Sequence, residues 1–253
     1  MPERTSYRQG MHCWVDLCTP DLEGAQRFYG ALLGWTYEGT GEASGHYTLC
    51  LRDGVPVAGL GPQPDASVPS MWSTYLASDD VDGTAARITK AGGQLLMPPM
   101  DIFGDGRMAY AADPTGATFG VWQGRGRRGA GVVGEAGTFA WNELHTPDGA
   151  AADGFYGAVF GYASEQIGDG RNFDYVTYRV GDEVAGGRLR VGSQDARSHW
   201  MTYLAVADTD AAAAAVAAAG GKVVREAVDS PYGRLAVVED PWGAAFTVMR
   251  LPG

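Results

Sequence analysis

The sequence predicts an α+β fold in which one short unit of strands and a helix recurs in two tandem halves. Compared with itself, Trp14–Gly34 (WVDLCTPDLEGAQRFYGALLG) matches Trp141–Gly161 (WNELHTPDGAAADGFYGAVFG) without a gap, at an offset of 141 − 14 = 127 residues. Glycine accounts for 38 of the 253 residues, about twice its usual share of roughly 7%. No G-X-Y period accompanies it, which excludes collagen. We therefore expect the glycines to lie in tight turns that join many short elements.

The repeat extends through the rest of both halves. Ser73–Leu96 matches Met201–Val224, and GRMAYAADPTGATFGVW at Gly106–Trp122 matches GRLAVVEDPWGAAFTVM at Gly233–Met249. We therefore predict two homologous domains, residues 8–124 and 138–253. The segment between them, residues 125–137, is rich in glycine and arginine, a composition typical of a flexible linker.

The first elements are a strand and a helix. His12–Cys18 alternates apolar and polar residues as a half-buried strand does. In the Thr-Pro-Asp sequence that follows, we expect Thr19 to be the helix N-cap and Pro20 the first helical residue. Apolar residues then recur at helical spacing, and Gly30 or Gly34 is expected to end the helix.

Further strands and a second helix follow. Asp53-Gly54 predicts a hairpin turn, and Gly92-Gly93 ends the second helix. The predicted elements are strands at His46–Arg52, Val55–Leu60 and Ser73–Ala77, a helix over about 81–91, and strands at Arg107–Ala112 and Thr118–Trp122. The apolar segment 97–104 is assigned to a loop. The second half follows the same plan, with an alanine-rich helix over 209–219 capped by Asp208 or Thr209.

Charge and cysteine content exclude several classes of protein. Lys and Arg number 19 against 30 Asp and Glu, a net charge of −11, so no basic face is available for nucleic acid. No apolar run is long enough to span a membrane, and the N-terminus lacks a signal-peptide core, so we expect a cytoplasmic protein with no membrane partner. Cys13, Cys18 and Cys50 form no C-x-x-C motif, which predicts free thiols.

Two motifs, each present twice, resemble a known family. FYGALLGW and FYGAVFGY follow a T-P-D helix start, and each half closes with GR-x-A-x-x-x-D-P-x-G-A-x-F. This combination resembles the vicinal oxygen chelate superfamily of glyoxalases, bleomycin resistance proteins and extradiol dioxygenases. It is most similar to the two-domain actinobacterial glyoxalase-like "hydroxylase" type, some members of which are encoded among polyketide antibiotic genes. The resemblance implies that each half contains two β-α-β-β-β modules in a cupped mixed or antiparallel sheet around a cavity, with helices outside.

The resemblance also implies where a divalent metal would be held. In this sequence those positions are Trp14, Thr74, Gly120, Trp141, Thr202 and Thr247. Indole cannot ligate such an ion, glycine has no side chain, and a lone threonine is a poor ligand. We therefore expect no metal cofactor. Glu143 and His145, on one face of a strand, remain an alternative, displaced metal site.

Residues expected to line the cavities form a candidate ligand-binding set. Tryptophan and tyrosine rings stack on flat aromatic ligands, and the tyrosines, including Tyr75 and Tyr203, would add hydroxyls. The alternative is that these rings only fill the core. The set contains Trp14, Trp72, Thr74, Trp122, Trp141, Trp200, Thr202, Tyr47, Tyr175 and Phe103.

Two carboxylates are candidate catalytic groups. Asp16 and Glu143 stand at equivalent positions, two residues after a tryptophan in each half. In an apolar cavity the pKa of either group would rise, which suits a general acid or base. The alternative is a structural carboxylate paired with an arginine such as Arg107 or Arg234.

These observations favour a metal-independent protein that binds an apolar or aromatic small molecule. A polyketide or antibiotic would suit such a site, for sequestration, resistance or delivery. The alternative is an enzyme on the same fold: a glyoxalase-like lyase or isomerase, or a hydroxylase or dioxygenase, with a non-standard metal site or an acid–base carboxylate. A third hypothesis is a scaffold whose cavity is filled by side chains. Either a monomer or a homodimer is compatible with two halves in one chain.

Overall fold

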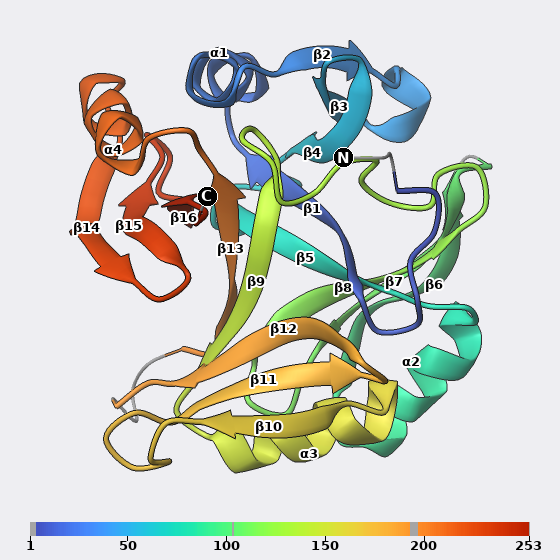
Figure 1. Ribbon diagram of the computed structural model, residues 1–253. Coiled ribbons are helices and arrows are strands. Elements are labelled where there is room, and N and C mark those ends of the chain that lie inside the picture. Colours follow the sequence, from blue (N-terminus) through green and yellow to red (C-terminus); the bar gives the residue numbers. More distant parts are fainter. Residues whose placement is uncertain (1–3, 103, 193–196, 253) are drawn as a thin grey trace.

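Two eight-stranded sheets with the same topology form the protein. A computed structural model describes residues 4–102, 104–192 and 197–252 (Figure 1). Its order of elements repeats from the first half to the second. The α+β fold of two tandem domains, with helices outside the sheets, is therefore confirmed.

The first sheet has the strand order β2-β3-β4-β1-β5-β8-β7-β6. Its strands are β1 (His12–Thr19), β2 (Thr36–Gly39), β3 (Thr48–Arg52), β4 (Val55–Pro62), β5 (Met71–Ala77), β6 (Gln94–Ile102), β7 (Gly106–Ala112) and β8 (Thr118–Gly124). The central pair, β1 and β5, is antiparallel and places Trp14 opposite Tyr75 and Asp16 opposite Ser73. Each central strand is parallel to its outer neighbour, β4 or β8.

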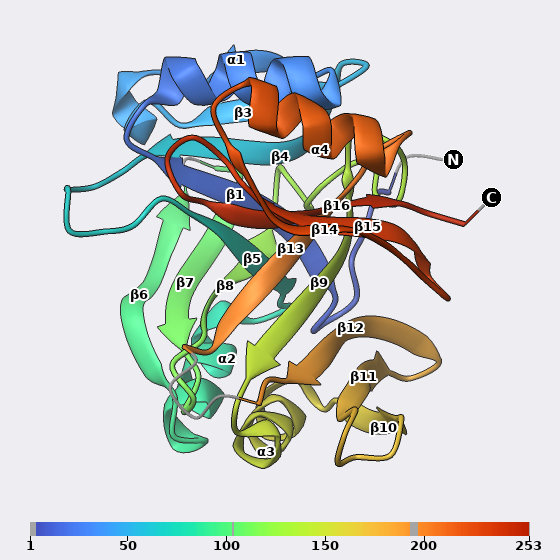
Figure 2. The same cartoon turned by 90° about the vertical axis from the view of Figure 1, so that its left-hand side faces the viewer.

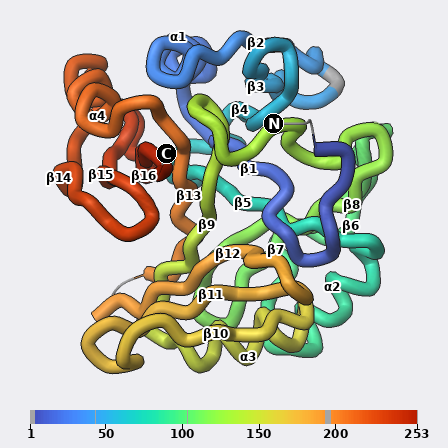
Figure 3. Tube along the Cα trace, viewed as in Figure 1, coloured from blue at the N-terminus to red at the C-terminus, as the bar shows by residue number. Residues whose placement is uncertain are grey.

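The second sheet repeats this arrangement in the order β10-β11-β12-β9-β13-β16-β15-β14. Its strands are β9 (Phe139–Thr146), β10 (Ala163–Ile167), β11 (Tyr175–Val180), β12 (Glu183–Arg190), β13 (His199–Ala205), β14 (Lys222–Ser230), β15 (Gly233–Glu239) and β16 (Ala245–Arg250). Strands β9 and β13 take the central places of β1 and β5. The two sheets meet where β13 contacts β5 (Figure 3).

Each α-helix begins after an aspartate that accepts a hydrogen bond from the backbone amide three residues on. The helices are α1 (Leu22–Leu33), α2 (Val81–Lys90), α3 (Gly149–Phe160) and α4 (Thr209–Ala218), and a short 3-10 helix η1 spans Glu42–Ser44. The N-cap of α1 is Asp21, so the prediction of Thr19 is wrong, because β1 continues through Thr19. Gly34, in the left-handed conformation, ends α1.

The helices pair across the two halves. Helix α1 lies beside α4, and α2 lies beside α3 (Figure 2). One hydrophobic core accordingly combines residues of α1 and β1–β5 with residues of β13–β16 and α4. The second core combines β5, β7, β8 and α2 with α3 and β9–β13. The halves are therefore interlocked, because each half completes its cores with elements of the other.

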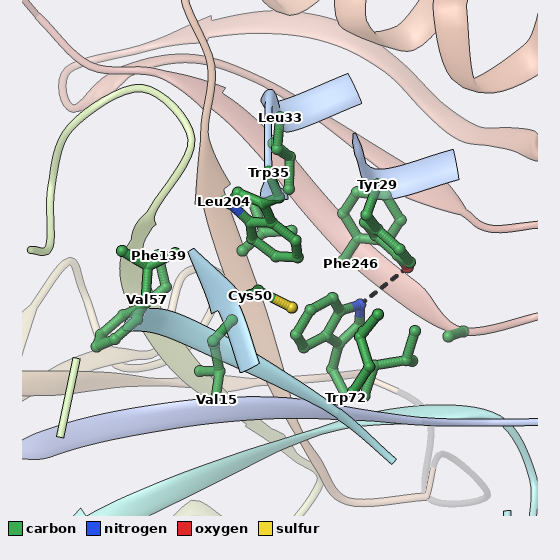
Figure 4. Packing of buried hydrophobic residues seen from close by; sticks show 14 of the residues in the cluster. Val15, Tyr29, Leu33, Trp35, Cys50, Val57, Trp72, Phe139, Leu204 and Phe246 are labelled. Carbon is green, nitrogen blue, oxygen red and sulfur yellow. Dashed lines mark hydrogen bonds between the residues drawn. The ribbon is translucent and has the colours of Figure 1, made fainter. Parts of the chain in front are cut away.

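A buried hydrogen-bond chain fastens the first of these cores. The hydroxyl of Tyr29, in α1, donates to a carboxylate oxygen of Asp240 at 3.0 Å. The same hydroxyl accepts from the indole N–H of Trp72 at 3.1 Å (Figure 4). Tyr29 has no exposed surface, so these bonds satisfy a polar group that water cannot reach.

The second core contains the equivalent arrangement of side chains. The indole N–H of Trp200 donates to the hydroxyl of Tyr156 at 2.9 Å, and this hydroxyl lies next to the carboxylate of Asp113. Tyr156 and its counterpart belong to the F-Y-G motifs, whereas Asp113 and its counterpart belong to the D-P-x-G turns. The two sequence motifs thus meet across the halves, one from each.

Two segments differ from the prediction. Residues 94–102 form the edge strand β6 instead of a loop; its Pro98-Pro99 pair coincides with a register shift, as an edge strand tolerates. Segment 125–137 is not a loose linker: the amides of Ala130 and Gly131 donate to the carbonyls of Cys13 and Pro56, both at 2.8 Å.

The pairing of β1 with β5 has an irregularity between His12 and Trp14. His12 packs edge-on against Trp200 and makes a 2.8 Å hydrogen bond with the Thr74 hydroxyl. Desolvation lowers the pKa of His12 to about 3. All three cysteines are free, as expected.

We expect His12 to make the fold acid-sensitive. A histidine whose folded-state pKa is depressed contributes stability above its unfolded pKa, near 6.5, and loses it as pH falls toward 3. Urea unfolding between about pH 6 and 4 is expected to show that the wild type loses about 1.4 kcal/mol per pH unit more than His12→Gln. Exposed His46, changed to Asn, is the control. Parallel pH profiles for the wild type and His12→Gln would contradict this account.

Candidate functional site

The first half encloses a cavity of about 540 Å³. Its floor is formed by Trp14, Asp16 and Cys18 of β1 and by Ser73 and Tyr75 of β5. These side chains share a face because the residues of paired strands alternate in step. The floor therefore brings one carboxylate, one thiol and several aromatic or hydroxyl groups together.

The walls are mostly apolar or aromatic. They come from β4, β6, β7, β8, the loops around η1 and β5, and the segment between the halves. The wall residues contributed by β6, β7 and β8 are Met97, Ile102, Met108, Tyr110 and Trp122. A concave apolar site with a few polar groups is the usual form of a small-molecule pocket.

Asp16 is the centre of the polar network in this cavity. Its Oδ2 accepts hydrogen bonds from the hydroxyls of Tyr75 at 2.9 Å and Tyr47 at 3.1 Å. The Tyr47 hydroxyl also accepts from the indole N–H of Trp14 at 2.8 Å. Among the described residues nothing donates to Asp16 Oδ1. Desolvation raises the pKa of Asp16 to about 6, although the two tyrosine bonds oppose the rise.

The predicted alternative, an arginine partner for the carboxylate, is wrong for both halves. Arg107 pairs with Asp82 at 2.8 Å, and Arg234 pairs with Asp210 at 2.6 Å. These ion pairs lie at the protein surface. Asp16 is thus held by neutral hydroxyl donors only.

Arg127 closes one side of the cavity from the segment between the halves. Its guanidinium binds Asp105 at 2.5 Å and lies 5.7 Å from the ring centroid of Trp14. Its backbone carbonyl accepts from the indole N–H of Trp122 at 2.9 Å. Sequence reasoning missed this residue, because its glycine-rich surroundings are typical of a linker.

The second half contains the same group of side chains around Glu143. Tyr203 donates to Glu143 Oε1 at 2.9 Å, and the indole of Trp141 donates to the Tyr175 hydroxyl at 3.2 Å. In addition, His145 Nε2 lies 2.7 Å from the same Oε1. Glu143 and His145 therefore share a strand face, as predicted.

Four members of the predicted ligand set lie on the opposite face of their strand from the tyrosine that bonds Asp16 or Glu143. On β5 the alternation points Ser73 and Tyr75 inward, so Trp72 and Thr74 lie on the opposite face, in the core. Trp200 and Thr202 are placed likewise: they bond Tyr156 and Asn142. Phe103 lies outside the described residues.

The residues present do not fit the divalent metal that the fold family implies. Gly120 is paired with Tyr75, and a Cβ at Gly120 would overlap Cδ1 of that ring. A glutamate there would need the space that Tyr75 fills. Over the described part of the chain, no group of three or more His, Cys, Asp or Glu side chains is arranged to hold a metal ion.

Fold and cavity together define a tandem protein of the glyoxalase type. Residues 13–121 match the family described as "Glyoxalase/Bleomycin resistance protein/Dioxygenase superfamily", and residues 141–249 match "Glyoxalase-like domain". The chain belongs to this superfamily, the vicinal oxygen chelate proteins. No helix in the described residues is long and apolar enough to cross a membrane.

Two relatives match almost the whole chain. "Putative glyoxylase CFP32" of Mycobacterium tuberculosis is 42% identical over 99% of this chain and 98% of its own length. "Anthracycline biosynthesis protein DnrV" of Streptomyces peucetius is 38% identical over 98% of this chain and 95% of its own length.

Solved structures share the fold at low identity. A Mn(II)-bound glyoxalase from Novosphingobium aromaticivorans superimposes with a TM-score of 0.64 at 17% identity, covering 95% of this chain and 82% of that one. The 2,3-dioxygenase LapB from Pseudomonas sp. KL28 gives 0.66 at 12%, covering 98% and 96%.

Asp16→Asn is expected to stabilise the protein at neutral pH. Because the folded-state pKa is raised from 3.8 to about 6, Asp16 stabilises the fold below about pH 4 and loses that contribution as pH rises through 6. Asparagine removes the buried charge and can still accept from Tyr47 and Tyr75. Urea unfolding should show a gain of about 1–3 kcal/mol at pH 7 that disappears near pH 4.

The control for this measurement is Asp53→Asn, a substitution at an exposed turn residue whose left-handed conformation asparagine tolerates. It should leave the free energy of unfolding nearly unchanged at both pH values. A loss of stability in Asp16→Asn at pH 7 would count against a desolvated, partly protonated Asp16.

Proposed function

We propose that the protein binds an apolar or aromatic small molecule in the first-half cavity, without a metal ion in that cavity. A natural product such as a polyketide or antibiotic would be held for sequestration, resistance or delivery. The supporting observation is the site itself: apolar and aromatic walls surround Asp16, and Tyr75 fills the space of a metal ligand. Relatives named as anthracycline biosynthesis proteins favour a ligand of this kind.

Size and surface chemistry agree with this proposal. A cavity of about 540 Å³ falls within the roughly 300–1,000 Å³ range of small-molecule pockets. Trp14 and Trp122 both line it, and each can stack on a flat ring for about 0.5–1.5 kcal/mol beyond the burial of area. The flexible thioethers of Met97 and Met108 adapt to ligands of different outline.

A second candidate function is acid–base catalysis in the same cavity. The raised pKa of Asp16, about 6, suits a group that accepts and returns a proton near neutral pH. Oδ1 is the atom that would take the proton from a bound substrate, since Oδ2 already accepts from two tyrosines. If the protein converts a bound compound, and Asp16→Asn abolishes the conversion but retains binding, this function is favoured over binding alone.

Gly61→Leu should block ligand binding. Gly61 lines the cavity on β4, next to Cys18, and a Cβ there meets Tyr47 only at an ordinary distance of 3.5 Å. The second half carries Leu189 at the equivalent place, beside His145, so the fold tolerates leucine there. In tryptophan-fluorescence titrations with a panel of aromatic natural products, we expect the Kd to rise at least about tenfold.

Gly154→Leu is the matched control, because a Cβ at this exposed residue of α3 meets nothing. It should bind like the wild type. The proposal fails if no compound of the panel quenches or stabilises the wild-type protein, or if Gly61→Leu binds as tightly as Gly154→Leu.

Removal of metal ions should leave binding unchanged. Since two phenols and an indole surround the only carboxylate on the floor of the cavity, no ligand set for Mn, Fe, Ni or Zn is present there. We expect metal analysis of protein purified without chelator to find far less than one ion per chain, and EDTA to leave the Kd unaltered. A stoichiometric ion whose removal abolishes binding would refute the metal-free proposal.

A further inference from the structure

The two halves contain equivalent groups of four side chains, an acid with one tryptophan and two tyrosines, here termed the acid–tyrosine quartet. In both, the tryptophan indole donates to one tyrosine, and the other tyrosine donates to the acid. The members are Trp14, Asp16, Tyr47 and Tyr75 in the first half and Trp141, Glu143, Tyr175 and Tyr203 in the second. The positions implied for metal ligands, by contrast, differ between the halves at Gly120 and Thr247.

One neighbouring position distinguishes the two quartets. The second half has His145 two residues after the acid, and its imidazole makes a 2.7 Å bond to Glu143 Oε1. The first half has Cys18 at the equivalent place, and no hydrogen bond joins the described thiol to Asp16. The first acid therefore has no such partner and lines a cavity, whereas the second acid has a histidine partner.

The chemistry of the open quartet restricts what can bind beside it. Tyr47 and Tyr75 both donate their hydroxyl protons to Asp16 Oδ2, so neither has a proton to offer a ligand. What remains on this part of the floor is an acceptor, Oδ1. A ligand that covers Oδ1 without a donor leaves this acceptor unpaired, which is costly, so a ligand that supplies a donor gains over one that does not.

We infer that the first-half quartet selects flat aromatic ligands that have a ring hydroxyl, which donates to Asp16 Oδ1. This inference depends on the proposed function, and it adds the class of ligand and the residue that recognises it. Asp16 is the recognition residue.

The test uses 2-naphthol and 2-methoxynaphthalene, which differ by one methyl group that removes the O–H donor. Isothermal titration calorimetry of the wild type should give about tenfold tighter binding of 2-naphthol. In Asp16→Asn the tyrosines bond the amide oxygen, so an N–H donor faces the cavity and the preference should fall to about one.

Cys18→Leu is the matched control, because it changes a neighbouring side chain on the floor of the cavity without altering the Asp16 carboxylate. It should retain the preference for 2-naphthol even if both compounds bind more weakly. The comparison between Asp16→Asn and Cys18→Leu separates loss of the acceptor from loss of space.

The outcomes distinguish this inference from the proposed function. If the wild type binds both compounds equally, or if Asp16→Asn retains the preference, hydroxyl recognition by Asp16 is refuted while aromatic binding stands. If the wild type binds neither compound, nor any member of the natural-product panel, the proposed function itself fails.

Discussion

The reciprocal contacts of Tyr29 with Asp240 and of Tyr156 with Asp113 are the constraint on which the rest of the structure depends. Each joins a helix of one half to a turn of the other, deep in a core where an unpaired hydroxyl would be costly. Because the helix-covered face of each sheet is buried in these shared cores, the other face of the first sheet is free to curve around a cavity. The cavity therefore depends on the interlocking of the two halves.

The elements that sequence reasoning found are those whose signal is local. The repeat, the helices and the hairpin turn at Asp53-Gly54 depend on periodicity and turn residues, and they appear where expected. Strand β6 was missed because Pro98-Pro99 argues against a strand locally, although an edge strand needs no donor there. The order of segment 125–137 comes from backbone pairing with Cys13 and Pro56, which composition does not encode.

Side-chain direction in the site was the least predictable feature, because a shift of one residue reverses a strand's faces. The resemblance to the family placed Thr74 in the cavity. The β1–β5 register instead places Tyr75 there and Thr74 against His12. Asp16, in contrast, was predictable as a raised-pKa group, since it lies two residues after Trp14 on the same face. Its tyrosine partners come from β5 and from the loop before β3, and they were foreseen only as hydroxyls.

The contrast between Asp16 and Glu143 is what links stability to function in this molecule. Glu143 has a histidine partner, so its buried oxygen is satisfied within the fold. Asp16 has a raised pKa and an oxygen to which no described residue donates, and an amide substitution would remove the desolvated charge. Local arrangements that reduce stability occur mainly where function requires them. Of the two acids, the uncompensated one lies in the apolar cavity, which is where a bound molecule could supply the missing donor.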